Sequence, residues 1–525
     1  MKNKLTNKTA IFFIFFFSIP FIFEIIIFPT SENIICSTLS WFWTIFTIRY
    51  FFWKNKEAIT VYNSFPLSSS SLVFFACVYF IFTLTFGMFY SKPLNYNLRN
   101  GTLPFIIPSL FYLLLILIHF AYRKILFFSR IKNSLTQIWK GLGLFHLPSL
   151  KEIYLVSSLG FLIYITIRKT VGVTDIETEN SYGGLMAYSV LFFNLMCIPS
   201  TILSNSQYNK VYSKKSLFNC YFFFGLLALI ATIYTGSRSL FIKYFISAAV
   251  CFSFGFKISS LFLKKKLFRN ISLIALLLIF LPLTNSLLGS VAKNRKENRD
   301  KGIIEKLQAN SENITKDKER DLDDIEEYIV DNSGVLGRLI FNKVLDNDLY
   351  FYNLIPLDLK NHLNLEIKNT LITSIVPSIF FGSRGAKKDI GSTYGSVTDA
   401  FRYFATGEGK GAFLEGSKQL EDFLIFEAPT FFILLFIIPF LSFCFLDSFV
   451  FLGRNHQIVS TIICLPSLTI TAFVLFKSSL FFIFRSLVLG IFPSALIAVL
   501  FFGFVRLLMR TFGLNNKNKD LLNQG

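Results

Sequence analysis

The residues best suited to chemistry in this chain are arginines that fall outside its long apolar runs. Arg238 lies in the short segment 235–239, TGSRS, where a tight turn would expose backbone N–H groups beside the guanidinium. A guanidinium binds phosphate through two parallel charge-assisted hydrogen bonds. Four further arginines share the same predicted membrane face: Arg338, Arg384, Arg402 and Arg485. Together they would suit a lipid diphosphate, although any single one could instead pair with a carboxylate or extend to the membrane interface.

A glycine- and hydroxyl-rich stretch, 381–411, is the second candidate for binding. Glycine lets a backbone approach a ligand closely, and the aromatic rings of Tyr394, Tyr403 and Phe404 could support sugar rings. A solvent-exposed loop would also be rich in glycine, so both interpretations stay open. The stretch contains no GxxxxGK[ST] motif, which argues against a nucleotide phosphate loop.

Other polar residues near these arginines could contribute to a site. Ser237 precedes Arg238, and Lys243 follows it by about a turn and a half of helix. His362 is the only histidine predicted on the same side, but one histidine does not by itself indicate acid–base catalysis. Glu24 and Asp447 lie in or at the ends of apolar runs, where charge is costly and often functional.

The cysteines do not indicate a metal site. All seven lie in or at the edge of apolar runs, and no Cys/His cluster has metal-ligand spacing. We therefore expect no metal and no cofactor, and read the cysteines as small packing residues.

The elements that must position these residues are membrane helices. Mean hydropathy is +0.55, 53% of the 525 residues are hydrophobic, and 67 are Phe. Apolar runs of about 20 residues cross a bilayer as helices. The sequence predicts an all-α, polytopic integral membrane protein with about twelve spans, the fifth short and extending into its flanks: 11–28, 34–53, 71–90, 105–122, 153–168, 185–203, 217–234, 240–256, 271–291, 430–447, 458–476 and 486–505.

The polar insert between spans 9 and 10 divides the chain into a bundle (1–292), a mostly helical loop (293–429) and a second bundle with a tail (430–525). The predicted loops on the N-terminal side carry 25 basic residues, whereas those on the other side, apart from the insert, carry seven. Because basic loops stay cytoplasmic, we expect both termini inside and the insert outside.

The chain's net charge of +20 does not indicate nucleic-acid binding. Residues 293–425 hold 19 basic and 22 acidic residues, so the excess lies in short loops rather than in one basic domain. One such loop, 123–152, mixes basic residues with Phe, Ile and Trp. This pattern is typical of an interfacial helix on anionic lipid.

The chain resembles the O-antigen polymerases, the Wzy-type oligosaccharide repeat-unit polymerases of bacterial surface-polysaccharide assembly. The resemblance rests on about a dozen spans with a dominant outer loop in the second half, and on the TGSRS turn at 235–239. It also rests on Arg384 being followed eleven positions later by Gly395. The charged segment 293–332 is longer than the family pattern leads us to expect.

The resemblance implies glycosyl transfer at the outer face of the bacterial cytoplasmic (inner) membrane. The growing glycan would leave its polyprenyl diphosphate and join the next lipid-linked repeat unit. The catalytic residues implied are Arg238 and Arg384, with Arg338 and Arg402 in support. Substrate binding would involve Ser237, Lys243, Tyr394, His362 and Arg485. Expected partners are the polyprenyl-diphosphate-linked oligosaccharide, membrane lipid and a chain-length regulator protein.

Two alternatives stay open. An O-antigen ligase would share the fold and the outer arginines, and would give His362 a role. A flippase or transporter would normally show internal repeats, which this sequence lacks, and polar breaks at the membrane midplane. A polyprenyl-phosphate-sugar glycosyltransferase should carry acidic residues in its first outer loop, whereas residues 29–33 contain only Glu32.

Overall fold

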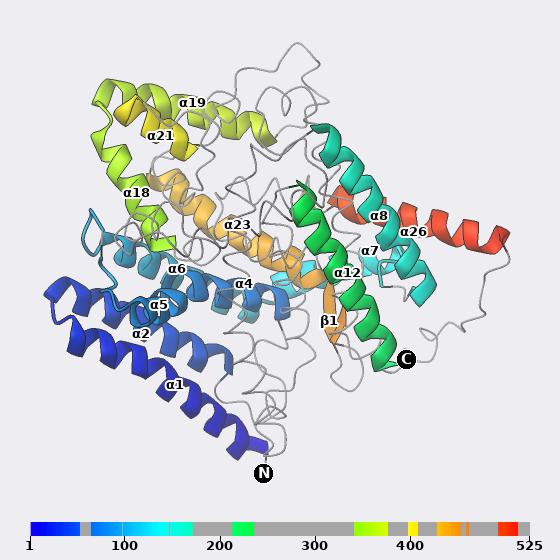
Figure 1. Ribbon diagram of the computed structural model, residues 1–525, viewed down its shortest axis with the longest axis horizontal. Coiled ribbons are helices and arrows are strands. Elements are labelled where there is room, and N and C mark those ends of the chain that lie inside the picture. The colour runs from blue at the N-terminus through cyan, green and yellow to red at the C-terminus, as the bar shows by residue number, and fades with distance from the viewer. Residues whose placement is uncertain are drawn as a thin grey trace, which may run out of the picture.

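A computed structural model describes ten stretches of the chain: 2–52, 65–96, 98–145, 148–171, 213–235, 341–375, 397–407, 428–452, 458–460 and 492–512. Their regular structure is almost entirely helical (Figure 1). The helices are α1 (Lys2–Ile27), α2 (Ser31–Phe52), α4 (Pro66–Ala76), η1 (Cys77–Ile81), α5 (Phe82–Tyr90), α6 (Leu103–Lys124), α7 (Leu126–Gly141), α8 (Leu150–Val171), α12 (Lys214–Thr235), α18 (Phe341–Leu354), α19 (Leu357–Ile375), α21 (Val397–Thr406), α23 (Ala428–Ser448) and α26 (Phe492–Thr511).

Three helical segments within these stretches are long and apolar enough to cross a membrane: Leu67–Thr85, Leu103–Lys124 and Leu150–Ile167. Shorter apolar helical segments occur at Ile11–Ile27, Phe222–Ala231 and Phe436–Ser448. Each lies at or overlaps a predicted span. The fifth predicted span does extend into its flanks, because α8 runs from Leu150 to Val171.

The outer surface of these helices is apolar. Phe15 is 68% exposed, Leu110 63% and Leu500 65%, and many other Leu, Ile and Phe side chains are similarly accessible. Soluble proteins rarely expose contiguous apolar surface on this scale. The arrangement fits helices whose outward faces contact acyl chains.

Aromatic side chains form the interior of the N-terminal group of helices, drawn in blue in Figure 1. Tyr112 of α6 stacks on Phe75 of α4, with centroids 5.4 Å apart and rings 2° from parallel. Trp43 of α2 meets the same tyrosine edge-on at 5.3 Å. The Tyr112 hydroxyl lies 2.9 Å from Thr47 Oγ1, so this buried phenol has a hydrogen-bond partner.

The third predicted span is not one regular helix. It begins at Pro66 rather than at residue 71, and a π-helical turn, η1, separates α4 from α5. The serines at 68–70 fell outside the predicted span, and Ser71 was its first residue. The helix buries all four, and Ser71 Oγ donates to Leu67 O at 2.8 Å. Such back-bonding satisfies a hydroxyl that water cannot reach.

Contacts between helix ends fix the relative directions of these segments. Asp447, near the end of α23, contacts Ser68 at the start of α4 and Tyr122 near the end of α6. At the opposite end, Asn342 of α18 contacts Thr83 of α5 and Pro104 of α6. Helix α6 and the segment α4–η1–α5 therefore run in opposite directions, and α23 ends where α6 ends and α4 begins.

A second group of helices contains α8, α12 and α26 (Figure 1). Tyr154 of α8 packs against Phe224 of α12 with centroids 5.8 Å apart, and Arg506 Nε of α26 lies 3.1 Å from Glu152 Oε1 of α8. The last predicted span was expected to end at residue 505, but α26 continues to Thr511. Pairing with Glu152 lets Arg506 remain within the helix.

The structure contains a small β-sheet that the sequence did not predict. Strand β1 (Val450–Leu452) pairs antiparallel with strand β2 (Ile458–Ser460). We expected a span to begin at residue 458, so the start of that prediction is wrong. Each strand has only three residues, and their mostly apolar side chains do not distinguish them from the neighbouring apolar runs.

Candidate functional site

The described stretches include two of the nine predicted site residues, Arg402 and His362. The other seven lie outside them: Arg238, Arg338, Arg384, Ser237, Lys243, Tyr394 and Arg485. The part of the insert that the structure describes comprises α18, α19 and α21.

His362 lies on the exposed side of α19. Its Nε2 is 3.4 Å from Glu366 Oε1, one turn later on the same helix, and the two side chains are 62% and 41% exposed. Exposed pairs with this spacing contribute little to stability. The structure places His362 in a solvent-facing pair within its own helix.

Arg402 lies on α21, which is attached to α18. Ala400 and Phe401 are fully buried, and the Phe401 ring meets Tyr352 of α18 at 5.4 Å in an edge-on arrangement. Arg402 follows directly and is half-buried. Its position is therefore set by the way α18 is fixed to the rest of the protein.

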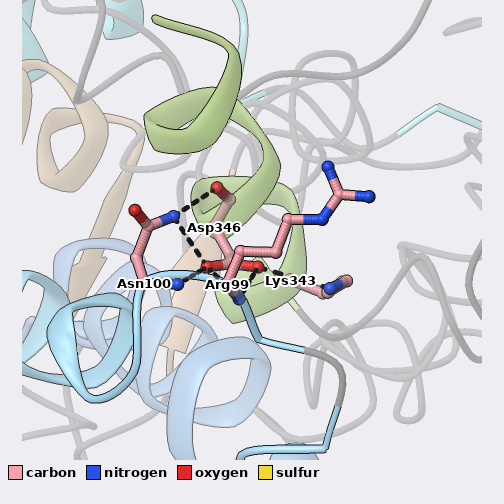
Figure 2. A network of polar contacts seen from close by, with 4 residues as sticks. All are labelled: Arg99, Asn100, Lys343 and Asp346. Carbon is pink, nitrogen blue, oxygen red and sulfur yellow. Dashed lines mark hydrogen bonds and ion pairs between the residues drawn. The ribbon is translucent and has the colours of Figure 1, made fainter. Parts of the chain in front are cut away.

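The attachment of α18 depends on a buried carboxylate (Figure 2). Asp346 accepts hydrogen bonds from the backbone N–H of Arg99 at 3.0 Å and of Asn100 at 2.9 Å. The Asn100 side-chain amide adds bonds of 2.9 Å to both Asp346 Oδ1 and the Asp346 carbonyl. Lys343 Nζ lies 3.3 Å from the same carboxylate, whose side chain is fully buried. We call these four residues the α18 junction.

Asn342 strengthens the α18 junction one turn earlier on the helix. Its amide donates to the Pro104 carbonyl at 2.9 Å, and its Oδ1 accepts from Thr83 Oγ1 at 3.2 Å. Thr83 lies near the end of the membrane-capable segment Leu67–Thr85, and Pro104 near the start of Leu103–Lys124. The insert is thus joined to the bundle where two membrane-capable segments end.

Arg99 is the functional candidate that sequence reasoning passed over. It is exposed, and its guanidinium carbon lies 4.0 Å from the ring centroid of Tyr350 on α18 (the ring is not drawn in Figure 2). The nearby Asp346 carboxylate is used by backbone N–H groups and Lys343, so it does not neutralise Arg99. Among the described residues, no carboxylate pairs with this guanidinium.

Cations also lie over tyrosine rings elsewhere at this end of the protein. Lys92 Nζ is 4.6 Å from the Tyr96 centroid, and Lys360 Nζ is 4.8 Å from that of Tyr352. A cation over an aromatic face is stabilised by the ring quadrupole. In sequence, Arg99 was one of two basic residues in a short loop. Its proximity to Tyr350, about 250 positions later, gives no local signal.

The opposite end of the bundle holds a second buried polar group. Asp447 accepts from the backbone N–H groups of Leu67 and Ser68, at 3.2 and 3.1 Å, and from Ser68 Oγ at 2.6 Å and the Tyr122 hydroxyl at 3.1 Å. His119 Nε2 lies 3.2 Å from Ser68 Oγ, and its Nδ1 lies 3.2 Å from the Tyr50 hydroxyl.

This second group has the composition of a hydrolase triad but not its arrangement. A catalytic aspartate orients the histidine, whereas Asp447 bonds to Ser68 and caps the start of α4. Ser68, His119 and Asp447 are all buried, with exposed fractions of 1% or less. We therefore assign Asp447 to joining α4, α6 and α23.

Glu24, the other charged residue noted in sequence, is fully buried between α1, α2 and α5. Its Oε2 accepts from Asn33 Nδ2 at 3.1 Å, and Asn33 Oδ1 accepts from the Leu94 N–H at 2.8 Å. A side chain on Gly87 would collide with Glu24 Oε1. Through Asn33, this arrangement connects α1, α2 and the segment that follows α5.

Within the described stretches, no three His, Cys, Asp or Glu side chains form a group that could hold a metal ion. No protein-family model, curated protein or solved structure matches the chain, so its resemblance to the O-antigen polymerases stays an expectation.

Proposed function

We propose that this chain is a membrane glycosyltransferase that polymerises polyprenyl-diphosphate-linked oligosaccharide repeat units. The observation that carries the proposal is the α18 junction. It holds part of the polar insert where the segments Leu67–Thr85 and Leu103–Lys124 end, and it presents Arg99 there. A lipid-linked diphosphate has its headgroup at the same depth, because its polyprenyl chain lies in the bilayer.

The proposal includes the finer topology expected from sequence. About twelve spans leave both termini in the cytoplasm, and the α18 junction lies on the outer face. The Asp447 group then lies on the cytoplasmic side. The basic loops support this direction, since residues 123–151, which begin in the last turn of α6, hold six Lys and Arg and no Asp or Glu.

The chemistry follows from the leaving group. The acceptor hydroxyl oxygen forms a bond to the anomeric carbon of the donor glycan, and the bond from that carbon to the diphosphate oxygen breaks. The hydroxyl proton passes to a base or to solvent, and polyprenyl diphosphate departs with its electron pair. Fixed cations stabilise the charge that develops on this diphosphate. We assign that role to Arg238 and Arg384, with Arg338, Arg402 and the newly found Arg99 in support.

The contact with the Tyr350 ring suits Arg99 to stabilising charge on the diphosphate. Packing on Tyr350 holds the Arg99 guanidinium in place without neutralising it, and the two backbone N–H bonds to Asp346 fix the Arg99–Asn100 segment. A cation fixed before the reaction needs little reorganisation as charge develops. Tyr403 of α21, which is exposed, would also offer a ring face for a sugar.

The test is the surface-polysaccharide ladder on a gel, in cells lacking this gene. They are complemented with wild type, Arg99→Gln, Arg402→Gln or Arg238→Ala, at matched expression. The control is Arg510→Gln, which removes an exposed arginine at the end of α26. Deletion should leave single repeat units on the lipid core. Wild type and the control should restore the ladder. Each site variant should lower polymer yield on the order of 10²-fold.

Other results would overturn the proposal. Long polymer on polyprenyl diphosphate, with none on the lipid core, would indicate an O-antigen ligase. Lipid-linked single units trapped inside the cell would indicate a flippase. A full ladder from all three site variants would refute the arginine mechanism, even if deletion gave single repeat units.

A further inference from the structure

Helix α7 begins where a membrane-capable helix ends. Lys124 is the last residue of α6, Ile125 is extended, and α7 starts at Leu126. With a single residue between them, α7 cannot lie far from the end of the membrane-capable helix. The bilayer surface is therefore within reach of its side chains.

One strip of α7 is fixed to the bundle. The Phe128 ring stacks on Phe440 of α23 at 4.4 Å and 7°. Two turns later, Thr136 Oγ1 donates to the Ser448 carbonyl at 2.9 Å, and Trp139 Nε1 donates to Ser448 Oγ at 2.8 Å. Contacts at both ends of the helix fix its rotation about its own axis.

The rest of the α7 surface separates into two strips. Successive residues of an α-helix turn by about 100°. On this basis Phe127 and Ile138 lie together, about a third of a turn from the bundle-facing strip, and are 63% and 53% exposed. Arg130 and Lys140 lie about a third of a turn further on and are also exposed. Ser129, Asn133 and Gln137 lie on this polar strip. The exposed Leu126, the first residue of α7, lies on it too.

The charge of this region has one sign. Residues 123–151 contain six Lys and Arg and no Asp or Glu. Lys132, which is half-buried, lies with its Nζ 5.2 Å from the Phe65 ring. Lys124, Arg130 and Lys140 are exposed. A positive strip beside an apolar strip is complementary to a lipid that carries an anionic headgroup on acyl chains.

We propose that α7 binds anionic phospholipid, with Phe127 and Ile138 among the acyl chains and Arg130 and Lys140 on the phosphodiester headgroups. The bundle contact determines which side of the helix faces the lipid. This site is separate from the α18 junction and does not depend on the proposed glycosyl transfer.

The first test measures headgroup selectivity on the full-length protein. Native mass spectrometry gives the Kd for dioctanoyl phosphatidylglycerol relative to dioctanoyl phosphatidylcholine. Each basic residue near an anionic surface contributes about five-fold to binding. The double variant Arg130→Gln/Lys140→Gln should therefore lose about 25-fold of the preference for phosphatidylglycerol. The matched control Lys215→Gln/Arg510→Gln removes two exposed charges elsewhere. Unchanged selectivity in the α7 variant, or an equal loss in the control, would overturn the proposal.

The second test examines the apolar strip. Ile138→Trp and Asn133→Trp place new indoles on the apolar and polar strips of the same helix. In phosphatidylglycerol bilayers with brominated acyl chains, the fluorescence added by Ile138→Trp should be quenched, and that added by Asn133→Trp should not. Equal quenching at both positions, or none at either, would mean that α7 does not lie on the bilayer as proposed.

Discussion

Replacing Asp346 with Asn should release α18 from the bundle while leaving the rest of the protein folded. The substitution keeps the size of the side chain but replaces one acceptor oxygen with an NH₂ group. In place of Oδ2 this NH₂ would face the Arg99 N–H and the Lys343 ammonium, and in place of Oδ1 it would face the N–H groups of Arg99 and Asn100. The Asp346 side chain is fully buried, so water can replace the lost bonds only at the part-buried donors.

The magnitude follows from these bonds. A buried donor without a partner costs about 1–3 kcal/mol, and more where a charged partner is lost. Because the Arg99–Asn100 segment is only part-buried, we expect a total of about 2–4 kcal/mol. At about 1.4 kcal/mol for each factor of ten, local opening of α18 should become roughly 30-fold to 700-fold more frequent.

Hydrogen exchange by mass spectrometry on the detergent-solubilised protein measures this opening. Peptides covering 341–354 should exchange faster in Asp346→Asn, and peptides covering α7 should not change. The control, Asp358→Asn, makes the same substitution at an exposed position in the first turn of α19. It should cost under about 1 kcal/mol. If α18 exchanges at the same rate in Asp346→Asn and in the wild type, the carboxylate does not hold the insert to the bundle.

Two further substitutions test the buried polar groups of the bundle. Asp447→Ala removes the acceptor at the start of α4 and should lower the free energy of unfolding by about 3–5 kcal/mol. The protein should then denature at a lower SDS concentration. An unchanged SDS midpoint would mean that this carboxylate is dispensable. Gly87→Ala forces a methyl group against Glu24 and Leu94 and should cost about 1–3 kcal/mol. A Tm equal to that of the wild type would show that these two side chains can move aside.

Much of the helical architecture could be predicted because backbone polar groups in lipid must form hydrogen bonds within the protein. An apolar run longer than the bilayer is thick must satisfy its own hydrogen bonds, so the runs 34–53 and 105–122 correspond closely to α2 and α6. The mixture of basic and apolar residues after α6 likewise indicated an amphipathic helix. In these cases the pattern lies within one segment of about twenty residues.

The polar connections could not be predicted in this way. Asp346 binds backbone atoms of Arg99 and Asn100, and nothing in a backbone N–H marks it as a partner in sequence. His119 is a single polar residue in an apolar run, so hydropathy averages it away. Arg99 differs from its neighbours only through its contact with Tyr350. Such features depend on which helix ends are in contact. The periodicity of a single segment does not show this.

The π-helical turn η1 has a consequence for how much change in length the third span can accept. A π-turn holds about one residue more than an α-turn, and one residue rotates a helix by about 100°. Deleting a residue within 77–81 would leave Ser68 facing Asp447 but turn Thr83 away from Asn342. Conversely, a regular helix of the present length could not engage both partners at once. The geometry of this one turn therefore sets whether the two ends of the span can be anchored together.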